Sequence, residues 1–281
     1  MEQQVNIITK NSRQYAALIH LGDLTQDNHP LEWYVVARSF QSFDNCHLPF
    51  TFSLGNHDIG SSPRKSADTR ESTLANKYFS LEKMKQKTYW GGSQDEKIDN
   101  HYIFVSAGGI DWLIISLAFG PSDETLDWAN TVVAQYPDRK VIVNTHAYMY
   151  SDDTRMGDGD KWLPQHYGIG KDTLTTVNDG EQIWIKFVSK HAHIIAVVSG
   201  HVLDSGVGTL VSAGINGNKV YQMLSNYQRG VGNSTMVTKG YYRILTFDKA
   251  NRRIEVETVS AVTGEKHPSG KHNFIFENVD L

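Results

Sequence analysis

The side chains with the clearest chemical meaning follow four apolar runs of the chain. The runs are residues 17–21, 49–54, 141–144 and 194–199, and the motifs that follow them are Gly22-Asp23, Gly55-Asn56-His57-Asp58, Thr145-His146 and Gly200-His201. Because α/β proteins place their chemistry at the carboxyl ends of strands, we expect these side chains to meet at one rim of a sheet. Carboxylate, amide oxygen and imidazole suit a divalent Mn, Fe, Zn or Co ion.

The four motifs supply the parts that hydrolysis of a phosphate ester requires. A bound metal ion activates water at neutral pH and neutralises phosphoryl oxygens. Asp23 is the candidate bridging carboxylate, Asn56 offers an amide oxygen, and His146 and His201 offer imidazole nitrogens. We therefore expect these four residues to fill the protein ligands of one metal ion, leaving positions open for water and phosphate.

His57 and Asp58 are candidate catalytic residues beside this site. If Asn56 binds the metal, His57 is held next to the site without being a ligand. That position suits a general acid for the leaving group, or a donor to the phosphoryl oxygens. We expect Asp58 to accept a hydrogen bond from His57 and to fix its tautomer.

In type and order, the motifs resemble those of the calcineurin-like metallophosphoesterase superfamily. Gly22-Asp23 matches its GD motif, Gly55-Asn56-His57-Asp58 its GNH[D/E] motif, Thr145-His146 its single-histidine motif, and Gly200-His201 the start of its GHxH motif. The resemblance implies a four-layer αββα sandwich of two mixed β-sheets flanked by helices, with a dinuclear metal site at the sheet edge. It also implies that Asp23 bridges two ions, that Asn56, His146 and His201 bind one of them, and that His57 lies near the leaving group.

All departures from the family pattern concern residues that would bind the second ion. The Asp-x-His that opens the family does not precede Asp23, and Leu203 stands where the last motif has its second histidine. A bacterial subgroup, often exported, is similar in having this Gly-His-Val-Leu variant. We expect one well-formed metal site and a doubtful second one. Either the chain begins inside the helix after the missing element, or the protein works with one ion.

Composition sets broad limits on the class of protein. The 281 residues are 40% hydrophobic and 21% charged, and we expect them to form one metallophosphoesterase domain over residues 1–281. A net charge of −4 without a basic run gives no argument for nucleic acid or a membrane surface. Cys46 is the only cysteine, so the chain forms no internal disulfide. The first residues lack the pattern of a signal peptide, and we expect a soluble chain.

Strands alternate with helices early in the sequence, and antiparallel pairs accumulate late. Apolar spacing predicts helices over residues 31–43, 123–135 and 179–191, and a polar segment over 70–87 that is partly helical. We expect a cap at Ser122 and a hairpin around Gly108-Gly109. Further strands are predicted at 219–226, 241–247 and 253–259, whereas the glycine-rich stretch 206–217 reads as hairpin turns. This pattern favours two packed sheets with helices outside.

The long segment between residues 147 and 178 is predicted to be irregular, and such loops are often functional. Because it follows His146, we expect it to form the substrate wall, with Arg155 and Tyr148 as candidate contacts to the phosphorylated substrate. The alternative is a solvated loop with polar surface residues.

The favoured function is a metal-dependent hydrolase of phosphomonoesters, phosphodiesters or phosphoanhydrides. One alternative is a degenerate family member that binds metal or a partner with weak or no turnover, which the missing first strand and Leu203 favour. Another is an enzyme completed by its neighbour, in a homodimer that pairs through an exposed sheet edge. The sequence names neither the substrate nor the metal.

Overall fold

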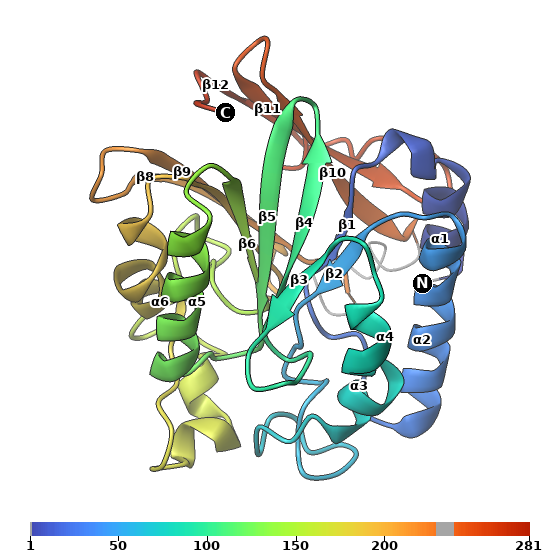
Figure 1. The fold of residues 1–281 in the computed structure, drawn as a ribbon, viewed down its shortest axis with the longest axis vertical. Helices are drawn as coiled ribbons and strands as arrows, with labels where there is room; N and C mark the ends of the chain where they lie inside the picture. Colours follow the sequence, from blue (N-terminus) through green and yellow to red (C-terminus); the bar gives the residue numbers. More distant parts are fainter. Residues whose placement is uncertain (1, 229–238) are drawn as a thin grey trace.

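A seven-stranded mixed sheet forms the centre of the computed structural model, which describes residues 2–228 and 239–281 (Figure 1). Its strand order is β3-β4-β5-β6-β7-β9-β8. The strands are β3 (Trp90–Ser93), β4 (His101–Ala107), β5 (Ile110–Leu117), β6 (Lys140–Thr145), β7 (Ile194–Ser199), β8 (Val207–Ala213) and β9 (Lys219–Ser225). Strands β5, β6, β7 and β9 are parallel, so their carboxyl ends meet at one edge. His146 and His201, two of the predicted site residues, come just after β6 and β7 in the chain.

A second β layer packs on one face of this sheet, and it is divided into two parts. One part is the parallel pair β1 (Leu18–His20) and β2 (Phe50–Phe52). The other is the antiparallel sheet β10 (Tyr241–Asp248), β11 (Arg253–Ser260) and β12 (Phe274–Glu277). Contacts between Trp112 and Phe247 and between Tyr221 and Phe276, each with ring centroids 4.7 Å apart, join the second part to the main sheet.

Helices lie on the outer side of the main sheet and of the β1–β2 pair (Figure 1). Helices α1 (Glu2–Lys10) and α2 (Pro30–Asn45) lie beside β1 and β2, and Phe40 of α2 packs edge-on against Phe50 with ring centroids 5.0 Å apart (Figure 1). Helices α5 (Asp123–Gln135) and α6 (Gly180–Lys186) lie beside the main sheet, and two short helices, α3 (Thr73–Tyr78) and α4 (Leu81–Lys85), precede β3. The predicted mixed α/β class, with two β layers and flanking helices, is confirmed; the divided second layer is the unexpected feature.

Most predicted elements are present, including the Ser122 cap, whose Oγ accepts from Thr125 N–H at 3.3 Å. One prediction was wrong. The glycine-rich stretch 206–217 contains strand β8, which pairs along its whole length with β9. Gly206 and Gly217, at φ +69° and +79°, lie in the turns on either side, while Val207–Ala213 pair as a strand. The glycine signal therefore belonged to the ends of this segment.

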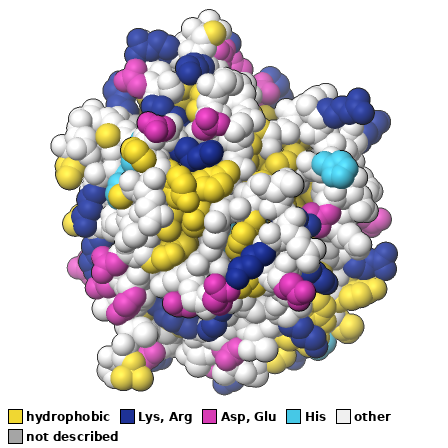
Figure 2. Space-filling model, in the orientation of Figure 1, with side chains coloured by type: hydrophobic (Ala, Val, Ile, Leu, Met, Phe, Trp, Pro, Cys, Tyr) yellow, Lys and Arg dark blue, Asp and Glu magenta, His cyan; other side chains and the backbone are white. Residues whose placement is uncertain are grey.

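The surface and the helices add two further observations. Acidic and basic side chains are interspersed over the face in Figure 2, and hydrophobic side chains gather in a hollow near its centre. Among the described residues, no helix combines the length and apolar character needed to cross a bilayer.

Candidate metal centre

The structure brings Asp23, Asn56, His146 and His201 together around one nitrogen atom. His146 Nε2 lies 3.2 Å from Asp23 Oδ1, 3.2 Å from Asn56 Oδ1 and 3.2 Å from His201 Nδ1. Asn56, His146 and His201 are almost fully buried, and the Asp23 side chain is 9% exposed. The segments that follow strands β1, β2, β6 and β7 thus meet at one point, as the motifs predict.

The hydrogen bonds on the far side of each ring direct lone pairs into the cluster. His146 Nδ1 lies 2.6 Å from Leu21 O, and His201 Nε2 lies 2.8 Å from Trp162 O. A carbonyl oxygen only accepts, so these two nitrogens carry the protons and a neutral ring presents a bare nitrogen to the cluster. Asn56 donates from Nδ2 to Ser66 Oγ at 2.8 Å, which turns its Oδ1 inward. With both rings neutral, the cluster therefore gathers acceptors and lacks donors.

The pKa values of these groups reflect the same convergence of negative charge and lone pairs. Burial by itself would lower the pKa of His146, but the Asp23 carboxylate outweighs it and raises that pKa. Burial lowers the pKa of His201 to about 3, and His146 adds to this shift. Burial would raise the pKa of Asp23, yet the interaction with His146 holds it well below its usual range. The Asp23 carboxylate thus makes the buried site favourable for a positive charge.

The donor set fits a divalent metal ion. Two donors at about 2.1 Å from a common ion lie roughly 3.0–3.4 Å apart for bond angles of about 90–109°, and the three separations here are 3.2 Å. Carbonyl partners on the outer imidazole nitrogens are typical of metal-binding histidines. Nevertheless, no group of three or more His, Cys, Asp or Glu side chains in residues 2–228 and 239–281 is already arranged as a metal site. Asp23, His146 and His201 alone therefore make an incomplete set of ligands, and metal binding at this cluster depends on the Asn56 amide oxygen as well.

Unusual backbone geometry positions two of the four candidate ligands. Asp23 and His201 have φ values of +52° and +70°, a region that residues other than glycine rarely adopt. Such conformations persist where the surroundings enforce them, and they concentrate at functional sites. The glycines of the motifs make room: a Cβ on Gly22 would lie 2.4 Å from His146 Nδ1, and one on Gly55 would lie 2.2 Å from Asp23 Oδ1.

We expect Gly55→Ala to weaken metal binding by at least about ten-fold, because the new methyl group must displace the Asp23 carboxylate. Titration of the metal-free protein with Mn²⁺ measures this change. The matched control is Gly270→Ala, since a Cβ at Gly270 meets nothing within 4 Å. Equal Mn²⁺ affinity in both variants would contradict the assigned position of Asp23.

His57 lies beside the cluster. We expected its ring to donate to Asp58, but the structure shows a different partner. His57 N–H donates to Asp23 Oδ1 at 3.2 Å, while its ring Nδ1 lies 2.7 Å from Gln26 O. The buried Asp58 carboxylate instead accepts from the backbone N–H groups of Gly55, Leu24 and Thr25 at 2.8–3.0 Å. Burial, reinforced by Asp23, raises the pKa of Asp58 to about 6. Asp58 joins the two motif loops, and a backbone carbonyl fixes the His57 tautomer.

Tyr148 and Arg155 are not placed at the cluster, so the structure gives no support to their predicted contacts with substrate. Tyr148 is fully buried and donates to Gln222 Oε1 at 2.8 Å. Arg155 pairs with Glu181 at 3.0 Å and lies over the Trp184 ring, 4.6 Å from its centroid. Both side chains therefore have their main contacts within the protein, away from the metal cluster.

The long loop reaches the cluster through residues that the sequence did not single out as ligand partners. Trp162, at φ +60°, presents its carbonyl to His201. Tyr167 lies near the Phe119 ring at 5.0 Å and the His201 ring at 6.0 Å, and burial raises its pKa to about 12. A backbone carbonyl leaves no signal in residue type, so only the length of the irregular segment pointed to its importance.

A family model described as calcineurin-like phosphoesterase matches residues 2–205 of the chain. With the four motif segments joined at the strand ends, this match shows that the chain belongs to the calcineurin-like phosphoesterase family, a family of phosphoester hydrolases, as the motifs indicated.

Two further proteins are similar to the chain. It is 27% identical to YvnB, an uncharacterized protein of Bacillus subtilis (strain 168), over 273 residues, which cover 95% of this chain and 19% of YvnB. The chain therefore spans about a fifth of the length of this curated relative. A crystal structure of a 5′-nucleotidase precursor from Thermus thermophilus is similar at 14% identity and a TM-score of 0.40, covering 92% of this chain and 46% of that one.

Proposed function

We propose that this chain is a metal-dependent phosphoesterase that hydrolyses phosphomonoesters or phosphodiesters. The convergence of three acceptors on His146 Nε2, each at 3.2 Å, carries the proposal. Membership of a phosphoesterase family supports the choice of reaction. Asp23, Asn56, His146 and His201 would hold a divalent Mn, Fe, Zn or Co ion, with Asp23 suited to bridge to a second ion.

When bound, the ion would supply positive charge for the phosphoryl oxygens and activate water as the nucleophile. The protein's own groups prepare the site for this chemistry. In the neutral rings, the carbonyls of Leu21 and Trp162 hold the protons on the outer nitrogens of His146 and His201, so the inward nitrogens would offer lone pairs to the ion. Ser66 keeps the Asn56 oxygen directed inward. Because these partners are fixed before substrate binds, little reorganisation is needed.

His57 is the group that we assign to the leaving-group oxygen. Its Nδ1 is engaged by Gln26 O at 2.7 Å, so Nε2 is the nitrogen free to deliver a proton. The side chain is half-buried, which leaves it open to substrate, and its backbone N–H is anchored on Asp23 at 3.2 Å. Asp58 contributes indirectly, by tying the loop that carries His57 to the loop that carries Asp23.

The proposal is tested by assaying chelator-treated protein on 4-nitrophenyl phosphate and bis(4-nitrophenyl) phosphate before and after adding Mn²⁺, Zn²⁺, Fe²⁺ or Co²⁺. We expect hydrolysis to be lost on chelation and restored by at least one ion. A chelated sample that keeps full activity would contradict metal dependence. Bound metal without hydrolysis of monoesters, diesters or phosphoanhydrides would instead favour a degenerate family member.

That second candidate has its own observation. Leu203 stands where the family's last motif has a histidine, and within the described part of the chain no further donor cluster takes its place. A site with one ion loses the bridging arrangement in which two ions hold both attacking and leaving oxygens. A degenerate family member of this kind is expected to bind one ion per chain and to show weak turnover.

A further inference from the structure

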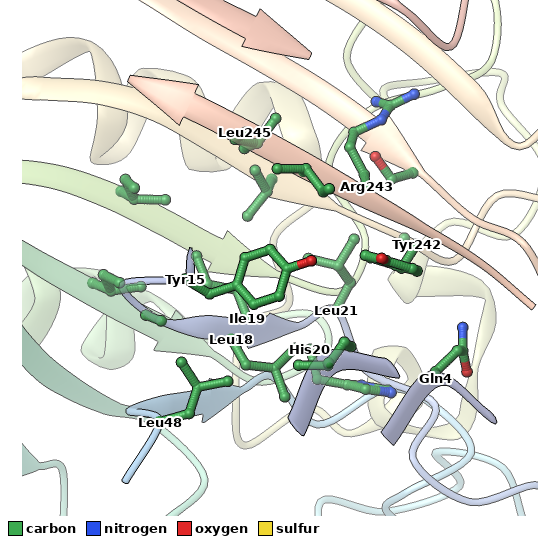
Figure 3. A pocket seen from close by; sticks show the side chains of 18 of the residues that line it. Gln4, Tyr15, Leu18, Ile19, His20, Leu21, Leu48, Tyr242, Arg243 and Leu245 are labelled. Atoms are coloured by element: carbon green, nitrogen blue, oxygen red, sulfur yellow. The ribbon is translucent and has the colours of Figure 1, made fainter. Parts of the chain in front are cut away.

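Tyr167 reaches the candidate metal centre from the long loop and not from the apolar groove that the cluster also borders. That groove lies between β1 and β10 (Figure 3) and encloses about 820 Å³, with Asp23, His146 and His201 at its margin. The described residues that line the groove do not include Tyr167. The long loop therefore forms a different wall of the same site, and that wall carries a phenol hydroxyl.

Hydrogen bonds fix the backbone of Tyr167 in a turn between two short 3₁₀ helices, Pro164–His166 and Gly168–Lys171. Tyr167 N–H donates to Pro164 O at 3.2 Å, and Tyr167 O accepts from Gly170 N–H at 3.1 Å. Because both backbone groups of Tyr167 are bonded within the turn, its side chain leaves the loop at a fixed point.

The same turn is docked on the loop that carries Ser66, the partner of the Asn56 amide. Ile169 N–H donates to Ala67 O at 3.0 Å. A Cβ on Gly168 would lie 2.3 Å from the backbone oxygen of the residue after Ala67, so only glycine permits this close approach. Loops that follow two different strands therefore hold the turn in place beside a candidate metal ligand.

Aromatic contacts fix the direction of the Tyr167 ring. The ring meets the buried Phe119 edge-on, with centroids 5.0 Å apart and planes at 83°, and lies 6.0 Å from the His201 ring. Phe119 also lies 5.0 Å from His201, so the three rings pack as one group beside the cluster. Burial and, after it, the Asp23 carboxylate raise the pKa of Tyr167 to about 12. The hydroxyl therefore lies on the side of Asp23 and stays protonated at neutral pH.

Packing explains the ring of Tyr167 but not its hydroxyl. Phenylalanine would make the same contacts with Phe119 and His201, and a tyrosine hydroxyl usually finds a hydrogen-bond partner when it is buried. Among the residues that the structure describes, the Tyr167 hydroxyl has no such partner, and the residue is only partly buried. The oxygen is therefore open to a ligand. Because a protonated phenol can donate, it suits a ligand that accepts hydrogen bonds.

Other protein donors are scarce at the cluster. Within residues 2–228 and 239–281, the four candidate ligands make polar contacts with one another, with backbone groups and with Ser66, and no Lys or Arg side chain is among these partners. His57 is already assigned to the leaving-group oxygen. Phosphoryl oxygens are strong acceptors, and the Tyr167 hydroxyl is a donor held at this site for them.

We propose that the Tyr167 hydroxyl donates a hydrogen bond to a non-bridging phosphoryl oxygen of the substrate. This inference rests on the proposed phosphoesterase function. Tyr167 neither gains nor loses a proton in this role. Because the turn and the packed rings hold the donor in place before substrate binds, the hydrogen bond can stabilise negative charge on the phosphoryl group without reorganisation.

Tyr167→Phe tests this role, because it deletes the hydroxyl and keeps the ring. For whichever of 4-nitrophenyl phosphate and bis(4-nitrophenyl) phosphate the unaltered protein hydrolyses, we expect kcat/KM to fall by about 10–100-fold. The affinity of the Mn²⁺-loaded protein for inorganic phosphate, measured by calorimetry, should fall by about ten-fold. The affinity of the metal-free protein for Mn²⁺ should stay unchanged, since Tyr167 is not a ligand.

Tyr34→Phe is the matched control. Tyr34 is 50% exposed on α2, and its hydroxyl accepts from Arg38 Nη1 at 3.2 Å. Its loss should change neither phosphate affinity, Mn²⁺ affinity nor turnover. Tyr167→Leu, which removes the ring as well, separates donation from packing.

Unchanged phosphate affinity and turnover in Tyr167→Phe would overturn the inference, and a loss confined to Tyr167→Leu would assign Tyr167 to packing around His201. A matching loss of Mn²⁺ affinity in Tyr167→Phe would also overturn it, because the hydroxyl would then support the metal ligands. If the unaltered Mn²⁺-loaded protein neither binds phosphate nor hydrolyses either ester, the proposed function fails together with this inference. Hydrolysis that is equal in the unaltered protein and in Tyr167→Phe removes this inference alone.

Discussion

His57→Ala is expected to lower turnover by about 10²–10⁴-fold while the protein keeps its bound metal. The ring is held by Gln26 O and is not among the four side chains that meet at the cluster, so its loss removes proton donation without removing a ligand. Steady-state kinetics and metal content by mass spectrometry measure the two quantities. The loss should be greatest for esters with poorly acidic leaving groups, because 4-nitrophenolate leaves without a proton.

His166→Ala is the matched control for this substitution. His166 is exposed and its side chain makes no hydrogen bond within the described residues, so turnover should stay unchanged. If His57→Ala keeps the turnover of the unaltered protein, His57 has no catalytic role. A loss of equal size for every leaving group would instead assign His57 to the phosphoryl oxygens.

Asn56→Ala is expected to weaken metal binding by at least about 100-fold. The substitution deletes the amide oxygen that lies 3.2 Å from His146 Nε2 and leaves two imidazoles and one carboxylate. Activity should fall at limiting metal concentration and recover in part at high concentration. Calorimetric titration of the metal-free variant with Mn²⁺ measures the change in affinity.

Ser66→Ala tests how much the hydrogen bond from Ser66 to the Asn56 amide contributes, apart from the amide oxygen itself. Ser66 Oγ accepts from Asn56 Nδ2 and donates to Asn56 O at 3.0 Å, so its removal frees the amide to turn but keeps the oxygen. We expect an affinity loss of about 10-fold, clearly smaller than that of Asn56→Ala. Unchanged Mn²⁺ affinity in Asn56→Ala would remove Asn56 from the ligand set.

The position of the four candidate ligands could be predicted from the sequence because each follows a strand. Runs of β-branched and apolar residues such as 141–144 indicate buried strands, and parallel strands deliver their ends to one rim. The order of strands was then enough to bring His146 and His201 together. The distances among side chains within the rim followed only from the structure.

Contacts made by backbone atoms could not be predicted in this way. The partner of His57 is the carbonyl of Gln26 rather than the neighbouring Asp58, and the partner of His201 is the carbonyl of Trp162. Any residue type can offer a carbonyl, so the sequence carries no trace of these bonds. The contacts of Arg155 and Tyr148 could not be predicted for a related reason: a position after His146 in the chain does not fix which way a long loop turns.

The split of the second β layer was likewise invisible in the sequence. Residues 17–21 and 241–247 each read correctly as strands, but which edge each strand leaves open depends on pairing between distant segments. A missing element before Asp23 had been noted as a departure of the motifs. Only the structure shows that β1 and β10 face one groove that ends at the candidate metal centre.

Anomalous diffraction from a crystal of the unaltered protein grown with Mn²⁺ tests the central claim most directly. The account predicts an anomalous peak within bonding distance, about 2.0–2.6 Å, of Asp23, Asn56, His146 and His201. The peak should be absent from a crystal of the Asn56→Ala variant grown with the same limiting Mn²⁺. A saturated crystal with no peak among these four side chains, or with its ion bound elsewhere, would contradict the assignment of this cluster as the metal site.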